Sequence, residues 1–428
     1  MPGSAVRSLA TFAVASALSI SGAFAGPPTG AAAGGPEPGR RAPVGEPVQV
    51  VGRCADRLGT SQLVTDLDGT STATWGCAHH VYAARTAADG TWQTAVDLGV
   101  GLEPKAAVDD RNRVTVLYRH LQGNGIESRR WAGAAWQPPV DLTWQTDAKR
   151  VFVQWYSIAS NARGDVVAVW TQNDGEVQSG PAPWMVAAYR PFDGAWTTTV
   201  RVAKRAFAQG SLVDGAGRVV TLPGLYRRTT GGVWRHPALP AMQGAWGGAA
   251  VNPAGDLLVT RTPTGGTTEA LVYEKPYGAA WLPAVQVGTT RSSGQVRAVL
   301  DDTGEAVVSF AAGGSARTAT RPAGGDWAAP VQVSESHVQA SVVRLDRGPD
   351  GSTAVSWLQG PDFVKRQLWV SVQPPGGDWS VPVRVTGARW RHVDHTTLSL
   401  RPDGALVVAW TGQRAGRTGW WFATRAIS

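Results

Sequence analysis

Hydrophobic and polar positions alternate along the chain in short stretches that recur at a nearly constant interval. The clearest copies, RPAGGDWAAPVQV (321–333) and QPPGGDWSVPVRV (373–385), share the frame P-x-G-G-D-W-x-x-P-V-x-V. Their V-x-V tails alternate apolar and polar side chains, as does a strand with one buried face. Weaker copies extend the series, so that the frame tryptophans follow one another at a mean spacing of about 48 residues. They are Trp92, Trp136, Trp196, Trp234, Trp281, Trp327 and Trp379.

A second frame lies between these tryptophans. It is an Asp/Gly turn followed by an alternating apolar strand that ends in an aromatic residue six positions after its glycine, as in ARGDVVAVW (162–170) and PDGALVVAW (402–410). With degenerate copies the frame occurs eight times, and a further strand precedes each frame tryptophan. Each unit therefore predicts four antiparallel strands in about 40–50 residues, which is typical of a propeller blade.

The two ends of the repeat region complement each other. The chain ends after the third strand of the last unit, WWFATRAIS, whereas an isolated outer strand, PVQV, stands at residues 47–50. If PVQV pairs with the last unit, the ring closes and leaves no exposed sheet edge. We therefore predict an all-β fold, a β-propeller of eight four-stranded blades closed by its N-terminal strand. Seven blades are the alternative, if the short unit between Trp196 and Trp234 merges with its neighbour.

Composition supports strands and tight turns over helices, because 20 Trp, 52 Gly and 28 Pro stand against 3 Met. A bulky residue at a fixed place in each repeat most often packs between neighbouring sheets, so we expect nearly all of the frame aromatics in the core. The aspartates of the second frame are expected to bond their own turn backbone.

The N-terminal segment predicts export. Residues 1–25 have one early cation, an apolar run and small residues before a cleavage point, which is typical of a secretory signal peptide. This run is too interrupted by serines for a membrane span, and no later segment is long enough. Residues 26–45, rich in Gly, Pro and Ala, predict a flexible leader, and residues 46–428 one propeller domain. In an exported chain Cys54 and Cys77 are expected to form one disulfide that holds the ring closure, with two free thiols as the alternative.

Strand alternation divides the loops between two faces of the ring. Loops from second to third strand, and from outer strand to next blade, share one face, here called the loop-rich face; the other two kinds form the turn face. All seven histidines and 17 cationic side chains fall on the loop-rich face against 8 carboxylates, an excess that about equals the net charge of +8. The ligand-binding candidates there are His79, His80, Arg119, His120, Trp155, His337, Arg389, Trp390, Arg391, His392, Asp394 and His395.

The chemistry of this face favours binding over catalysis. Its positive field attracts anions, and aromatic residues suit sugar rings. His392, Asp394 and His395 are possible metal ligands, but their spacing matches no strong motif, so no metal and no cofactor is predicted. Glycoside hydrolysis needs two carboxylates that face each other across a sugar, and nothing in the sequence pairs two. The sequence contains neither a nucleophile elbow nor a P-loop, and export argues against nucleic acid as the partner.

The repeat resembles secreted bacterial β-propellers over residues 46–428. Sialidases are similar in their Asp- and Trp-bearing blades, but their Trp stands three residues after the glycine, whereas here it stands six after, as in Gly164 to Trp170. Quinoprotein dehydrogenases with eight blades carry an adjacent cysteine pair that is missing here. Propeller lectins are closest in repeat length and Trp content. That resemblance implies carbohydrate binding without assigning any residue.

Three hypotheses for function follow. The leading one is a secreted, monomeric, non-catalytic binding module that captures an anionic glycan, such as a cell-envelope component, or a protein partner on its loop-rich face. The alternative is a carbohydrate-active hydrolase or lyase that uses His392, Asp394 or His395 at the mouth of the ring. A structural envelope protein is the third, and it predicts a flat face. Whether the protein is an enzyme stays open, with the non-catalytic function favoured.

Overall fold

The computed structural model describes residues 48–49, 61–87, 90–121, 125–144, 151–174, 183–236, 245–262, 268–290, 296–336 and 339–425. Over these ranges the chain is all-β, and no helix there is long and apolar enough to cross a membrane. The predicted signal peptide and leader, as well as Cys54 and His337, lie outside the described residues, so the export signal and the disulfide stay predictions.

The strands form eight four-stranded antiparallel sheets, which are the blades of a β-propeller. Blade 1 contains β2 (Ser61–Thr65), β3 (Ser71–Cys77), β4 (His80–Arg85) and β5 (Val96–Val100). Blade 2 contains β6 (Leu102–Val108), β7 (Val114–Arg119), β8 (Ile126–Arg130) and β9 (Val140–Asp141). Blade 3 contains β10 (Val151–Ser160), β11 (Val166–Asp174), β12 (Trp184–Arg190) and β13 (Val200–Lys204). Blade 4 contains β14 (Gly210–Val213), β15 (Val219–Leu222), β16 (Arg227–Arg228) and β17 (Trp234–Arg235).

The second half of the ring repeats this plan. Blade 5 contains β18 (Ala245–Val251), β19 (Leu257–Thr262), β20 (Thr268–Lys275) and β21 (Val285–Thr290). Blade 6 contains β22 (Arg297–Leu300), β23 (Ala306–Ala312), β24 (Ser315–Arg321) and β25 (Val331–Gln332). Blade 7 contains β26 (Ser341–Arg347), β27 (Thr353–Gln359), β28 (Gln367–Gln373) and β29 (Val383–Arg384). Blade 8 contains β30 (Trp390–Leu400), β31 (Leu406–Arg414), β32 (Arg417–Arg425) and the N-terminal β1 (Val48–Gln49).

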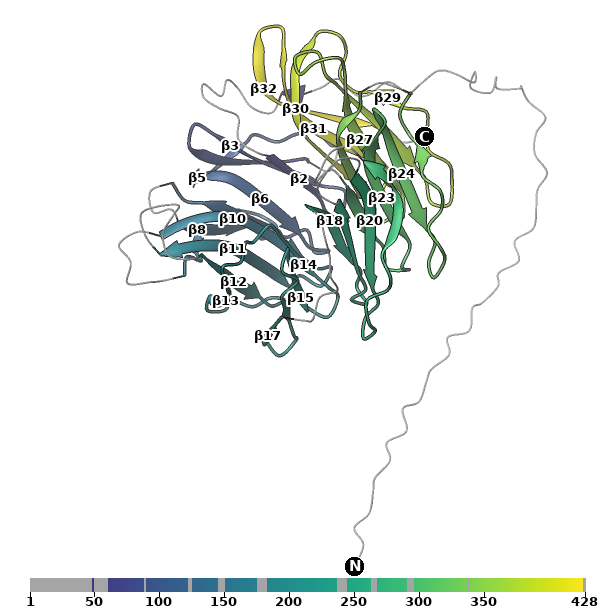
Figure 1. Cartoon of the computed structure of the whole chain (residues 1–428). Coiled ribbons are helices and arrows are strands. Elements are labelled where there is room, and N and C mark those ends of the chain that lie inside the picture. Colours follow the sequence, from purple (N-terminus) through teal and green to yellow (C-terminus); the bar gives the residue numbers. More distant parts are fainter. Residues whose placement is uncertain are drawn as a thin grey trace, which may run out of the picture. The chain divides into compact units, whose positions relative to one another are not determined.

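Ring closure follows the prediction. β1 pairs antiparallel with β32, with Val48 opposite Phe422 and Gln49 opposite Trp421. The inner strands contact one another in chain order, and β30 contacts β2, so blades 8 and 1 lie side by side (Figure 1). The seven-blade alternative is wrong: the short unit before Trp234 forms blade 4 by itself, with two-residue strands β16 and β17.

The turn face contains the predicted aspartate turns. Asp350 Oδ1 accepts a hydrogen bond from the Ser352 amide at 3.0 Å, and Asp403 Oδ1 accepts one from the Ala405 amide at 3.0 Å. Two aspartates that precede the frame do the same: Asp66 Oδ1 accepts from the Thr70 amide at 2.8 Å, and Asp214 Oδ1 from the Arg218 amide at 2.9 Å. Gly69 in the Asp66 turn has a φ of 78°, a conformation that glycine adopts without steric cost. The Asp side chains therefore fix the turns between inner and second strands.

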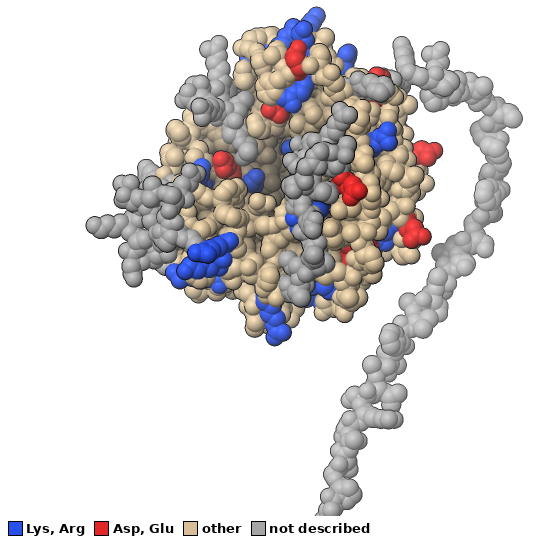
Figure 2. Space-filling model, viewed as in Figure 1, with Lys and Arg blue, Asp and Glu red and all other residues tan. Residues whose placement is uncertain are grey.

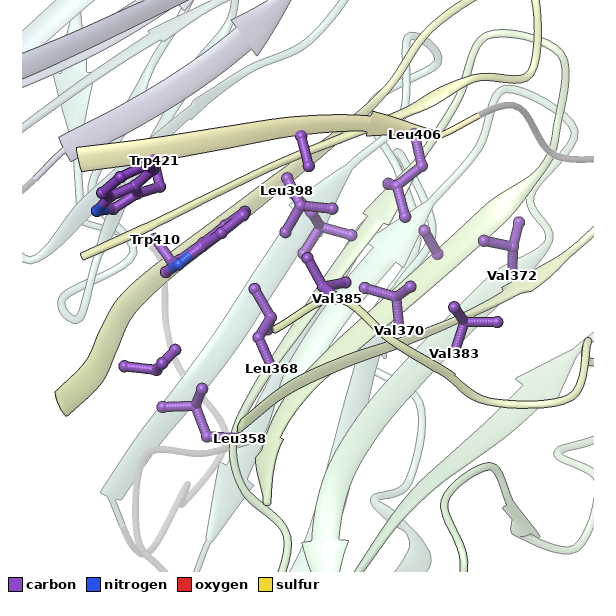
Figure 3. Close-up of a cluster of buried hydrophobic side chains, with 14 of the residues drawn as sticks. Leu358, Leu368, Val370, Val372, Val383, Val385, Leu398, Leu406, Trp410 and Trp421 are labelled. Carbon is purple, nitrogen blue, oxygen red and sulfur yellow. The ribbon is translucent and has the colours of Figure 1, made fainter. Parts of the chain in front are cut away.

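Eight hydrophobic clusters fill the eight spaces between neighbouring blades. The second-frame aromatics lie at their centres with no exposed surface, among them Trp75, Trp170, Trp357 and Trp410. Figure 3 shows the cluster between blades 7 and 8, where Leu358, Leu368 and Val370 face Leu398, Leu406 and Trp410. The frame tryptophans, such as Trp327, are half-buried and cover the outer edges of these clusters.

One carboxylate in this framework is expected to make stability depend on pH. Burial raises the pKa of Asp346 on β26 to about 6, although the Leu400 amide donates a hydrogen bond to its Oδ2 at 2.9 Å. Because the folded state holds this proton more tightly than the unfolded chain, its contribution to stability is complete below pH of about 4 and is lost as pH rises through about 6.

Asp346→Asn keeps a carbonyl acceptor for Leu400 and removes the charge. Between pH 4 and 7.5 we expect the unfolding free energy of the wild type to fall by on the order of 2 kcal/mol relative to that of the variant. Urea unfolding of both proteins at several pH values measures this difference. Parallel pH profiles for the two proteins would contradict the assignment.

Candidate functional site

The two faces of the ring differ in how their charges are compensated. On the turn face, Arg113 Nε lies 2.7 Å from Asp109 Oδ2, and Arg347 of blade 7 reaches Asp301 of blade 6 at 2.7 Å. On the loop-rich face Arg389 and Arg391 are exposed, as the excess of cations there predicts. Figure 2 shows a hollow near the middle of the face in view, with basic and acidic side chains at its edge.

Five inner strands are interrupted by bulges where they enter the loop-rich face. The register shifts at 102/105 in β6, at 154/156 in β10, at 246/249 in β18, at 341/344 in β26 and twice between 391 and 397 in β30. The bulge of β18 consists of Gly247 and Gly248, and every other bulge contains a residue with positive φ: Glu103 (53°), Trp155 (30°), Val342 (51°), His392 (51°) and His395 (46°). Bulges and strained backbone of this kind redirect side chains and are over-represented at functional sites.

A pocket of about 490 Å³ opens beside the bulges of β6 and β10. It is called the Trp155 pocket here and is lined by Glu103, Lys105, Arg119, Phe152, Gln154, Trp155, Tyr156, Ala208 and Gln209. These residues come from the inner strands of blades 2 and 3, from the end of β7 in blade 2 (Arg119) and from the segment that enters blade 4. The pocket therefore lies at the loop-rich mouth of the ring, where inner strands meet.

An exposed aromatic pair borders this pocket. Trp155 is 51% exposed and Phe207 is 41% exposed, and their rings meet edge to face with centroids 4.9 Å apart. Tyr156 holds the bulge in place, because its hydroxyl donates to the carbonyl of Leu102 at 2.9 Å and also bonds that of Glu103. Burial raises the pKa of Tyr156, so this hydroxyl stays protonated and remains a donor at neutral pH.

Two cations complete the Trp155 pocket. Arg119 donates to the Val153 carbonyl at 3.4 Å, and its guanidinium lies 3.9 Å from Glu103. Burial lowers the pKa of Lys105, the charge of Arg344 lowers it further, and the Glu103 carboxylate opposes the shift. The pocket thus combines an apolar ring face, amide groups of Gln154 and Gln209, and positive charge.

The remaining candidates of blades 1 and 2 lie at the rim. His79 is exposed at the tip of the β3–β4 hairpin, and His80 Nδ1 lies 2.8 Å from Asp97 Oδ2. His120 follows β7, half-buried, with its Nε2 3.9 Å from Glu127 Oε1. Of the predicted candidates that the structure describes, only Arg119 and Trp155 line the Trp155 pocket.

The blade 8 candidates separate along β30. Trp390 is 5% exposed and packs against Trp410 and Trp421, so its ring belongs to the core. His392 is exposed, its amide donates to the Val364 carbonyl at 2.9 Å, and its ring lies 6.1 Å from that of Phe363. Asp394 and His395 follow further along the strand. Within the described ranges no three His, Cys, Asp or Glu side chains lie close enough to hold a metal ion.

Several residues of the Trp155 pocket were not among the sequence-based candidates. Lys105, Gln154, Tyr156 and Gln209 line it, and Phe207 forms its aromatic edge. Strand alternation already placed both Lys105, near the start of β6, and Phe207, between β13 and β14, on the loop-rich face. Their meeting with Trp155 depends on the bulges, which leave no periodic signal.

A second pocket, of about 520 Å³, lies on the turn face between blades 5 and 6. Its Glu274 carboxylate is already engaged, because Trp327 Nε1 donates to Glu274 Oε1 at 2.7 Å and Arg321 Nε lies 3.2 Å from the same oxygen. This pairing leaves fewer charged groups available to a ligand in the turn-face pocket than in the Trp155 pocket.

No protein-family model matches the chain, and no curated protein matches it in sequence. Among solved structures, the BP39L lectin from Burkholderia pseudomallei is 14% identical, with a TM-score of 0.51 over 77% of this chain and 98% of that chain. A puromycin hydrolase is 14% identical, with a TM-score of 0.49 over 87% of this chain and 52% of that chain. A fungal alcohol oxidase of the AA5 family, in complex with copper, is 12% identical, with a TM-score of 0.47 over 90% and 76% of the two chains. At these identities the chain is similar to solved proteins in fold alone.

Proposed function

We propose that this protein is a carbohydrate-binding propeller that captures an anionic glycan in the Trp155 pocket. The observation that carries the proposal is the exposed Trp155–Phe207 pair, set in a strained bulge beside Lys105 and Arg119. Aromatic faces pack against the apolar face of a sugar ring, and amide and charged groups at the edge give hydrogen bonds that orient it. The 490 Å³ volume is in the range of ordinary ligand pockets.

The proposal includes export through residues 1–25, so that the ligand is an extracellular or cell-envelope polysaccharide. The excess of cations on the loop-rich face supports an acidic glycan, because a positive face raises the local concentration of anions. The predicted Cys54–Cys77 disulfide belongs to the same proposal and would join the closing strand region to blade 1. If no glycan binds on an array, a protein partner on this face is favoured instead.

A hydrolase or lyase at the mouth of the ring is the second candidate. The observation in its favour is the pair of bulges in β30, which places two strained residues, His392 and His395, on either side of Asp394. Release of reducing sugar from a bound acidic glycan would favour this candidate over simple binding.

The aromatic pair provides the first test. We expect the protein to bind acidic glycans on an array, with binding that weakens as salt is raised from low to physiological concentration. Trp155→Ala and Phe207→Ala should each weaken binding by about tenfold or more, because exposed aromatic anchors contribute about 1–2 kcal/mol. Tyr277→Ala removes a 59% exposed aromatic from a turn-face loop and should bind as the wild type does. Equal binding by all four proteins would contradict the Trp155 pocket.

The charge of the loop-rich face provides the second test. The double variant Arg389→Glu, Arg391→Glu reverses two exposed cations. We expect slower association, by about tenfold at low salt, and a weaker dependence on salt. Arg384→Glu, on the outer strand β29, makes the same kind of charge change away from the mouth and serves as the control. Surface plasmon resonance at two salt concentrations measures the rates. An unchanged association rate would contradict a role of Arg389 and Arg391 in binding.

A further inference from the structure

Three basic side chains occupy one level of the ring. Lys105, Arg297 and Arg344 stand on inner strands β6, β22 and β26. Each lies opposite the residue that precedes the buried second-frame aromatic of its blade. The pairs are Lys105 with Leu117, Arg297 with Ser309 and Arg344 with Ser356. Equivalent register in equivalent blades places the three at one height along the axis of the ring.

Blade 2, which carries Lys105, lies across the axis of the ring from blades 6 and 7, which carry Arg297 and Arg344 and adjoin each other. The charge of Arg344 lowers the pKa of Lys105, and burial together with the charge of Arg297 lowers the pKa of Arg344 to about 10. These effects agree with the common height of the three positions around the axis, where like charges repel one another.

The cluster lacks a counter-charge within ion-pair distance. Among residues that the structure describes, none of the three forms an ion pair; Glu103 and Asp394 only moderate the pKa of Lys105 and Arg344 from further away. Arg344 donates to the Thr396 carbonyl at 3.2 Å, and Arg297 donates to the Gly247 carbonyl at 3.4 Å. The Arg297 Nε is buried without a hydrogen-bond partner. The three residues are half-buried. Partly desolvated cations without a paired anion destabilise a fold, unlike the paired arginines of the turn face.

The other five blades contribute no charge at this ring position. Blade 4 contributes Gly210, blade 5 has its Gly247–Gly248 bulge there, and blades 1, 3 and 8 contribute the neutral Gln62, Ser157 and Thr397. Gln62 is engaged, because its Oε1 accepts a hydrogen bond from the Ala106 amide. Lys105 also lines the Trp155 pocket, so one member of the cluster belongs to that pocket as well.

We propose that Lys105, Arg297 and Arg344 form an oxyanion-binding site on the axis of the ring, which takes a carboxylate, sulfate or phosphate group. Guanidinium groups match the geometry of these oxyanions with paired hydrogen bonds, and the ammonium group adds charge. The inference rests on the proposed function in one respect: the oxyanion is the acidic group of the glycan whose sugar ring packs on Trp155.

If these cations bind a ligand, replacing them with neutral residues should have the opposite effect on stability from the one expected if they stabilise the fold. If the cations serve a ligand, Lys105→Met and Arg297→Met relieve repulsion in the free protein and remove its response to oxyanions, as is common where function costs stability. If they serve folding, the same variants are destabilised. Arg384→Met on the outer strand β29 is the matched control, since it removes one cation away from the axis.

Thermal unfolding of the full chain, followed by tryptophan fluorescence, separates these cases. The anions are glucuronate, sulfate and phosphate at about 5 mM, with ionic strength held constant by NaCl. We expect at least one to raise the Tm of the wild type and of Arg384→Met by about 2 °C, and none to shift Lys105→Met or Arg297→Met. In NaCl alone these two variants should unfold at or above the wild-type temperature. The anion that shifts Tm distinguishes a uronic acid from a sulfate or phosphate ester.

The proposal is overturned if no oxyanion shifts the wild type, or if Lys105→Met and Arg297→Met respond as the wild type does. Lower unfolding temperatures of both variants in NaCl would also overturn it. This test needs no glycan. A clear shift of Tm by an oxyanion, together with no binding on the glycan array, would support the oxyanion site and contradict the proposed function.

Discussion

Burial of apolar side chains between neighbouring blades is the interaction on which the rest of the structure depends. Each blade is apolar on both sheet faces, so it needs a neighbour on either side, and only a closed ring supplies one to every blade. Trp420 and Phe422 of blade 8 pack with Leu63 and Trp75 of blade 1 in the cluster that joins the two ends of the ring. Two residues of β1 complete blade 8 next to this cluster. Closure is therefore enforced by eight equivalent interfaces rather than by the short terminal strand alone.

The closed ring also explains where chemistry gathers. Eight inner strands face one axis, so side chains far apart in sequence, such as Lys105 and Arg344, come within electrostatic reach of each other. The turn face has a stabilising function, with aspartates that fix turns and pair with arginines. Among the residues that the structure describes, the loop-rich face shows no such uniform pairing, and its inner strands carry the bulges that expose Trp155 and open the pocket. Stability and recognition are thus divided between opposite ends of the same strands.

Much of this architecture could be predicted from the sequence because it rests on local periodicity. The eight blades, the closing strand, the buried Trp170 and Trp410, and the aspartate turns all follow from alternation and repeat spacing. The site was less predictable. The positive φ of Trp155 depends on Tyr156 bonding to the neighbouring blade, and no sequence pattern encodes that contact. Trp390, between two exposed arginines, resembles a surface residue in composition, but strand alternation turns it into the core.

The most direct measurement is a crystal structure of the full chain with a bound oligosaccharide that contains glucuronate. We expect a sugar ring against Trp155 and the carboxylate within hydrogen-bond distance of Lys105, Arg297 or Arg344. A ligand bound instead in the turn-face pocket beside Trp327, or on the rim without contact to Trp155, would contradict this expectation.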